Sequence, residues 1–235
     1  MLSLSSGSWR LQTRFRHCSS LLSLRYPTDN CAALYPNDNL GTPINPQDIF
    51  IDFLQHNAST NLVSSYVNSS SFARQNGKPF MMFETNTASC AGFPGLSDSF
   101  GAALWGIDWA MTMVTNGFSA AMFHVGGQNA YYNPFTPPPT NQTKYGIQWT
   151  VGPIYYSALA MAEALGPNNQ SQVSDITQNI NTPMYAIFEN GVPTKVALFN
   201  FVTDPSGAST YTAVISVGGG ATGQSNATPS QVQVK

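Results

Sequence analysis

The chain has 235 residues, of which 42% are hydrophobic and only 9% are charged. Average soluble domains carry roughly 25% charged residues, and the scarcity of Lys and Arg argues against a nucleic-acid partner. The hydrophobic content argues against an intrinsically disordered chain. No stretch approaches roughly 18 uninterrupted apolar residues, so we expect neither a transmembrane helix nor a membrane partner.

The first residues differ in charge from the rest. Residues 1–27 contain four of the nine basic residues and no acidic residue, whereas residues 28–235 contain five basic and all eleven acidic residues. The start has no apolar run of roughly 7–15 residues, so we expect no secretory signal peptide in this chain. An Arg-rich, acid-free start is typical of an organelle transit peptide. The alternative is that residues 1–24 are a divergent or disordered segment outside the folded domain.

The first half of the chain predicts short helices and one buried strand. Residues 26–47 are rich in Pro, Asn and Asp and predict a loop. Apolar spacing predicts helices over 47–56 and 62–76. The run KPFMMFET at 78–85 is typical of a strand that is buried on both faces.

The next predicted elements are a helix, a strand and a second helix. The strongest predicted helix spans 97–116, with Ser97 and Asp98 as candidate caps. A second buried strand is predicted over 119–125 and a further helix over 153–165. Strand, helix, strand and helix in this order indicate a βαβα unit with a parallel sheet.

After Gly166 the pattern changes to short strands separated by turns. Strands are predicted over 184–190, 195–202 and 209–217. Their spacing indicates an antiparallel module with only three or four strands, fewer than a β-sandwich needs.

No cofactor chemistry has support in the sequence. No cysteine pair has metal-ligand spacing, and there is no G-x-S-x-G, Walker, H-E-x-x-H or dinucleotide-binding fingerprint. We therefore expect neither a metal nor a cofactor.

Two features are typical of an extracellular chain. Cys31 and Cys90 lie in polar, loop-like segments and can form one disulfide in an oxidising compartment, which requires Cα atoms within roughly 7 Å. Five Asn-x-Ser/Thr sequons are candidate glycosylation sites. They are Asn57, Asn68, Asn141, Asn169 and Asn226.

The placement of the three glutamates is informative. Glu163 and Glu189 are expected on the solvent side of a helix and before a turn. Glu84 ends a buried strand and enters a polar loop. The carboxyl ends of parallel strands are where α/β folds place active sites. The alternative is a Glu that only caps the turn after the strand.

A glycine-rich and aromatic loop follows the second strand. His124 ends that strand and precedes Gly126 and Gly127, and Tyr131 and Tyr132 follow. Glycines allow backbone amides to approach a ligand, and tyrosines suit the apolar face and hydroxyl rim of a sugar. The alternatives are a packed histidine, ordinary turn glycines and a loop that buries its own aromatics. We expect Glu84 to lie near His124 and this loop.

Three sequence blocks carry a resemblance to a known family. The blocks FETNTASCAGFPGLSDSFGAALWGIDWA, FHVGGQNAYYNPFTPPPTNQT and QWTVGPIYYSALAMAEALG resemble fungal glycoside hydrolase family 79, which contains β-glucuronidase-like enzymes. The resemblance runs from about Tyr26 to the C-terminus. It implies a (β/α)₈ barrel with an appended β-sandwich and an extracellular location. We therefore expect an α/β fold with an incomplete barrel over 25–175 and a truncated antiparallel β-sandwich over 176–235.

The resemblance also implies a mechanism and a site. Retaining glycosidases use two carboxyl groups about 5 Å apart, a nucleophile and an acid/base. Glu84 matches the family's nucleophile in its Glu-Ser/Thr-Asn context, and the loop residues match a sugar pocket around a uronate carboxylate. The expected substrate-binding residues are Asn86, His124, Gly126, Gly127, Tyr131 and Tyr132.

One part of the family pattern is missing. The family's acid/base glutamate follows an asparagine upstream of the nucleophile, and no glutamate precedes Glu84 here. General acid assistance is typically worth about 10²–10⁴ in rate. Two hypotheses follow. The chain is a fragment of a retaining β-glycosidase that carries the nucleophile, with a β-glucuronide-like carbohydrate as partner, or it is a non-catalytic remnant or sugar-binding module.

Overall fold

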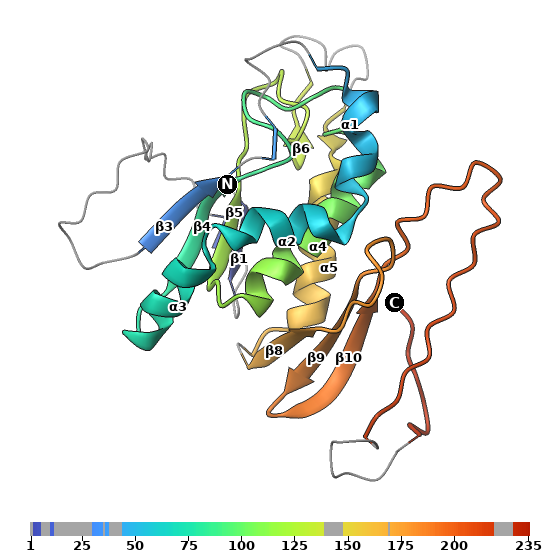
Figure 1. Cartoon of the computed structure of the whole chain (residues 1–235). Helices are drawn as coiled ribbons and strands as arrows, with labels where there is room; N and C mark the ends of the chain where they lie inside the picture. Colours follow the sequence, from blue (N-terminus) through green and yellow to red (C-terminus); the bar gives the residue numbers. More distant parts are fainter. Residues whose placement is uncertain are drawn as a thin grey trace. The chain divides into compact units, whose positions relative to one another are not determined.

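The computed structural model describes most of the chain as a mixed α/β fold (Figure 1). The described residues are 2–5, 10–11, 30–34, 36–37, 44–138, 148–168, 170–218 and 228–235. The chain divides into two units, Met1–Val202 and Thr203–Lys235. All named helices and strands lie in the first unit, so the predicted domain boundary between 175 and 176 stays a prediction.

A five-stranded sheet forms the first part of this unit. Its order is β2-β1-β5-β4-β3, with β1 at Leu2–Ser5, β2 at Arg10–Leu11, β3 at Asn30–Leu34, β4 at Phe80–Thr85 and β5 at Ala120–Phe123. β3, β4 and β5 run parallel, whereas β1 pairs antiparallel with β5 and β2 antiparallel with β1. The predicted parallel pair is therefore confirmed.

The strand β3 corrects the prediction of a continuous loop over 26–47. Its five residues, NCAAL, are too short and too little apolar to stand out beside the surrounding Pro, Asn and Asp. Pairing with β4 makes them a strand, since tertiary pairing overrides weak local preference.

Three short helices precede β4. α1 spans Pro46–Phe53 and begins at Asn45, whose side chain accepts a hydrogen bond from the Gln47 amide at 3.3 Å. α2 spans His56–Ser64 and α3 spans Val67–Gln75. The single helix predicted over 62–76 is therefore wrong, because this stretch breaks between Ser64 and Val67. Its many Ser and Asn side chains compete with the helical hydrogen bonds.

The core of the unit is built around α4, which spans Phe100–Thr115. Ten of its sixteen residues are buried, and they include the polar residues Asp108 and Thr112. Its cap is Ser99, which accepts a hydrogen bond from the Ala102 amide at 3.3 Å. The predicted caps are wrong because Asp98 accepts from the Gly95 amide and Ser97 from the Phe93 amide.

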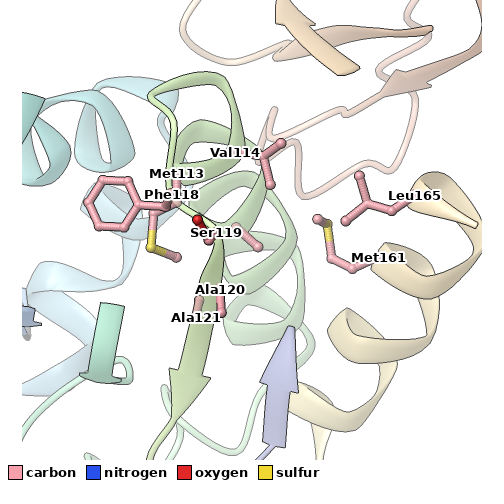
Figure 2. A pocket seen from close by; sticks show the side chains of 9 residues that line it. Met113, Val114, Phe118, Ser119, Ala120, Ala121, Met161 and Leu165 are labelled. Carbon is pink, nitrogen blue, oxygen red and sulfur yellow. The ribbon is translucent and has the colours of Figure 1, made fainter. Parts of the chain in front are cut away.

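α5, at Pro153–Leu165, packs closely against α4 and has the predicted bounds. A Cβ at Gly106 would lie 2.7 Å from Ile154 Cδ1, so glycine permits this approach. Figure 2 shows a small, mainly apolar pocket between α4, α5 and the first residues of β5, the strand end opposite to His124. It is lined by Ala110, Met113, Val114, Phe118, Ser119, Ala120, Ala121, Met161 and Leu165.

A second, antiparallel sheet follows α5 with the order β10-β9-β8. β8 spans Ser171–Asp175, β9 Met184–Glu189 and β10 Val192–Leu198. The strand predicted over 184–190 is confirmed. The strand predicted over 195–202 forms instead at 192–198, directly after the Asn190-Gly191 turn, and residues 199–202 lie outside it. The strand predicted over 209–217 is wrong, because no strand forms over 209–216. β8 was not predicted because SQVSD has no apolar alternation.

No helix in the described part of the chain combines the length and apolar character needed to cross a membrane.

The packing of α5 on α4 predicts a large difference between two of its side chains. Met161 is 0% exposed and Leu159 is 48% exposed. Met161→Ala removes fully buried methylene and sulfur atoms, so we expect the free energy of unfolding to fall by about 2–5 kcal/mol. Leu159→Ala is the matched control and should change it by less than about 0.5 kcal/mol. Urea unfolding followed by tryptophan fluorescence measures both; equal losses would contradict this packing.

Candidate functional site

The carboxyl ends of β4 and β5 bring the predicted site residues together. Thr85 lies opposite Phe123 in the parallel pair, and the His124 amide donates a hydrogen bond to the Thr85 carbonyl at 2.9 Å. Glu84 is the penultimate residue of β4 and His124 directly follows β5. The two side chains therefore start from neighbouring strand ends.

The end of β4 departs from regular strand geometry. Phe80 and Met82 are buried, and strict alternation would turn Glu84 to the same face, into the core. The register with β5 shifts between Met82 and Thr85, so Thr85 is buried instead and Glu84 is partly exposed. Irregularities of this kind re-aim side chains beside functional sites. Glu84 thereby escapes burial among apolar side chains.

Thr85 is held in its inward position by α4. The Trp109 Nε1 donates to Thr85 Oγ1 at 3.1 Å, and both residues are fully buried. A buried indole N–H needs an acceptor, so this hydrogen bond stabilises the irregular register and with it the outward turn of Glu84.

Asn86 ties the two strand ends together. Its Nδ2 donates to the His124 carbonyl at 3.0 Å, and its Oδ1 accepts from the Thr87 amide at 2.9 Å. The side chain is fully buried. The structure therefore places this predicted substrate-binding residue beneath the site, as a link between backbone segments.

A buried tyrosine packs against His124. The Tyr132 hydroxyl lies 2.9 Å from His124 Nδ1, and the two rings pack edge to face with centroids 5.7 Å apart. Burial raises the pKa of Tyr132, a backbone hydrogen bond from Ala91 opposes this, and the negative charge of Glu84 raises it further. Tyr132 and His124 thus form a hydrogen-bonded pair, and Glu84 starts from the neighbouring strand end.

The two loop tyrosines have different environments. Tyr131 is 42% exposed and Tyr132 is 3% exposed. The loop therefore buries the ring of Tyr132 and leaves that of Tyr131 accessible to solvent. Beyond them, β6 (Phe135–Thr136) pairs with β7 (Thr150–Val151), and the Phe135 ring packs on Tyr155 of α5.

The glycine turn after His124 is fixed by Asn133, an asparagine of the aromatic loop. Its Oδ1 accepts from the Gly126 amide at 2.9 Å and its Nδ2 donates to the Gly127 carbonyl at 2.8 Å. A Cβ at Gly126 would lie 2.7 Å from the Ala130 Cβ, which explains the glycine. The only sequence signal was an amide residue near a Gly-Gly pair.

A strained turn contacts the aromatic loop. Cys90, Ala91 and Gly92 have consecutive φ angles of 53°, 77° and 75°. Non-glycine residues rarely adopt positive φ angles, and those that do are concentrated at functional sites. The Tyr131 amide donates to the Ala91 carbonyl at 2.8 Å and holds the turn. Cys90 is exposed. The side chain of Cys31 lies outside the described residues, so the predicted disulfide stays a prediction.

The predicted glycosylation sites are described in part. Asn57 and Asn68 are exposed on α2 and α3. The other three, Asn141, Asn169 and Asn226, lie outside the described residues. Within the described part of the chain, no group of three or more His, Cys, Asp or Glu side chains is placed to hold a metal ion.

The fold is similar to that of a solved glycosidase. A crystal structure of a 4-O-α-L-rhamnosyl-β-D-glucuronidase from Fusarium oxysporum 12S, with Rha-GlcA, matches with a TM-score of 0.57 and 21% sequence identity. The match covers 79% of this chain and 35% of that one. It supports the mixed α/β architecture.

Two curated relatives are similar in sequence, and both are named beta-glucuronidase. The Aspergillus niger protein is 31% identical over 160 residues, which are 63% of this chain and 28% of the relative. The Neurospora crassa protein is 32% identical over 134 residues, 52% of this chain and 23% of the relative. No family model matches the chain. The resemblance to fungal β-glucuronidases is confirmed, and the chain spans about a quarter of these relatives' length.

The clamp on the glycine turn predicts the effect of a substitution. Asn133→Ala removes both hydrogen bonds to the turn, so we expect a loss of about 1–3 kcal/mol in the free energy of unfolding. Asn129→Ala, an exposed asparagine of the same loop, is the matched control and should change it by less than about 0.5 kcal/mol. Urea unfolding measures both; an unchanged Asn133→Ala would show that the clamp contributes no stability.

Proposed function

We propose that the chain carries the nucleophile of a retaining β-glycosidase of the glycoside hydrolase family 79 type. The substrate class is a β-linked glucuronide or a related β-linked sugar. One observation carries the proposal: Glu84 is partly exposed near the carboxyl end of a central parallel strand, next to the strand end that carries His124. The similarity to two proteins named beta-glucuronidase supports the choice of reaction.

Glu84 would act as the nucleophile. A carboxylate oxygen attacks the anomeric carbon, the bond from that carbon to the leaving-group oxygen breaks, and a covalent glycosyl-enzyme forms. Water then attacks the same carbon, its proton passes to a general base and the Glu84 carboxylate is released. The reaction requires the sugar to reach Glu84, which its partial exposure permits.

The neighbouring groups would position Glu84 and the sugar. The Tyr132 hydroxyl, shared with His124 Nδ1, is a donor that can orient either the carboxylate or a sugar hydroxyl. Tyr131 offers an exposed aromatic face to the sugar ring. Gly126 and Gly127 allow close approach of the backbone, and Asn86 and Asn133 hold the loops that carry these groups.

The remaining features of the proposal concern the rest of the enzyme. β3, β4 and β5 with their helices would be strands of a (β/α)₈ barrel over 25–175, and the antiparallel sheet would be part of a β-sandwich over 176–235. In the family the acid/base precedes the nucleophile, and Glu84 is the first glutamate of this sequence. The acid/base would therefore come from outside these residues. Secretion, glycosylation and a Cys31–Cys90 disulfide belong to the same proposal.

A second candidate function is binding of a sugar without hydrolysis. The exposure of Tyr131 and of the glycine turn, and the partial exposure of Glu84, support it. Such a module would need no second carboxyl group.

A labelling experiment tests the nucleophile without the acid/base. In a 2-deoxy-2-fluoro β-glucuronyl fluoride the leaving fluoride needs no general acid, and the fluorine slows hydrolysis of the glycosyl-enzyme. Incubation of the 235-residue chain should add one glycosyl group, and peptide mass spectrometry should locate it on Glu84. Glu84→Gln should lose the label. Glu163→Gln, at an exposed glutamate of α5, should keep it.

Labelling on another residue would overturn the assignment of Glu84. A folded chain that binds the sugar by calorimetry but takes no label would favour the binding module. A folded chain that neither binds nor reacts would contradict both functions. Turnover of an aryl β-glucuronide that Glu84→Gln abolishes would show that an acid is present within the chain itself.

A further inference from the structure

A buried polar cluster joins α2, α4 and the antiparallel sheet. Asp108 of α4 accepts hydrogen bonds from Ser59 Oγ of α2 at 2.6 Å and from Tyr185 OH of β9 at 2.6 Å. Its Oδ1 also lies 3.0 Å from His56 Nδ1 of α2. All four side chains are buried. A carboxylate in such a place requires several donors, and the cluster supplies three.

His56 connects this buried cluster to a second carboxylate. Its other ring nitrogen, Nε2, lies 2.8 Å from Asp175 Oδ2 at the end of β8. A neutral imidazole has one N–H and one lone pair, so it can donate to only one of two carboxylates. Only the imidazolium form donates to both Asp108 and Asp175. The geometry therefore matches a protonated His56.

The two carboxylates are not equivalent. The Asp108 side chain is 1% exposed and keeps two other donors, whereas the Asp175 side chain is 30% exposed. Asp175 Oδ1 also accepts from the Thr177 amide at 2.9 Å. When His56 loses one proton, the remaining N–H stays with the buried Asp108, and the lone pair on Nε2 then faces Asp175. Asp175 can turn to water, so this is the contact that breaks.

Backbone contacts lie directly beside the bridge. The His56 amide donates to the Ile180 carbonyl at 2.7 Å, and Asn181 Nδ2 donates to the Leu54 carbonyl at 3.3 Å. The connection between β8 and β9, residues 176–183, is thus held against the start of α2. The Ile176 amide in turn donates to the Met184 carbonyl at 2.9 Å.

We propose that His56 is a pH-dependent latch, which holds the end of β8 and the β8–β9 connection against α2 when protonated and releases them when neutral. The ionisable groups that face it are Asp108 from α4, Asp175 from β8 and Tyr185 from β9. The neighbouring helix α1 carries Asp48 and Asp52, which are exposed. The proposal does not depend on the glycosidase function.

The direction of the titration agrees with this geometry. Burial lowers the pKa of His56, but the hydrogen bonds and charges of Asp108 and Asp175 outweigh it and raise the pKa above the ordinary 6.5. A raised folded-state pKa gives stability that is complete below pH 6.5 and is lost as the pH rises through the folded value. Burial raises the pKa of Asp175, and hydrogen bonds from Thr177 together with His56 lower it overall. Its stabilisation is lost only as the pH falls below about 4.

Two measurements on the 235-residue chain test the latch. NMR titration of the imidazole should give His56 a midpoint above 6.5, with protons on both ring nitrogens below it. Amide hydrogen exchange, corrected for the chemical rate, should show protection of the His56 and Ile176 amides falling as the pH rises through that midpoint, because the neutral imidazole no longer donates to Asp175. The two midpoints should coincide.

Asp175→Asn is the informative variant. An amide accepts from an N–H and donates to a lone pair, so it pairs with either form of His56. The pH-dependent fall in amide protection should disappear, and the titration midpoint of His56 should move to lower pH. Asp204→Asn, at an exposed carboxylate of the second unit, should leave both unchanged. On the unmodified chain, a titration midpoint of His56 below pH 6.5 would overturn the proposal. Amide protection that does not change across that midpoint would overturn it as well. Neither outcome requires the variant to fold.

Discussion

The buried carboxylate of Asp108 constrains how α2 and the antiparallel sheet pack on α4. It is a charged group on an otherwise apolar helix, and burying an unpaired charge costs several kcal/mol. The donors that satisfy it come from α2 and β9, 49 and 77 positions away in the chain. Their hydrogen bonds fix where α2 and the antiparallel sheet lie on α4. Tyr185 adds a hydrogen bond with Thr112, one helical turn further along the same face. Apolar contacts alone allow packed elements to shift relative to one another. Directional hydrogen bonds to a buried group fix their relative position.

The same helix determines the candidate site. Trp109 follows Asp108 in the chain. Successive residues of a helix point about 100° apart, so the two side chains contact different elements. Trp109 reaches Thr85 at the end of β4, and Thr85 can accept that hydrogen bond only because the strand register shifts. Glu84 is partly exposed for this reason, although its position in a run of apolar residues would bury it in a regular strand. The outward turn of the proposed nucleophile thus depends on a hydrogen bond inside the core.

The sequence predicts those parts of the fold whose causes are local. The helix over 153–165 has its predicted bounds because Pro153 can begin a helix and Gly166 can end one with a positive φ. The sequence singles out Glu84 as a candidate because a carboxylate at the end of an apolar run is unusual. β3 and β8 were missed because their residues become strands only through pairing with β4 and β9. The clamp by Asn133 and the bridge of His56 between Asp108 and Asp175 were missed because the partners lie far apart or share no periodic pattern. No spacing rule relates positions 56, 108 and 175.

The polar residues around Glu84 and those around Asp108 differ in how far their side chains are accessible. Around Glu84 the hydrogen bonds of Asn86 and Asn133 hold backbone segments, while Glu84 and Tyr131 remain accessible. A ligand can meet such a site without dismantling the fold. Around Asp108 nearly every polar atom is engaged inside the protein, and only the Asp175 end reaches water. The first arrangement suits binding and chemistry, and the second suits control of how the antiparallel sheet is attached.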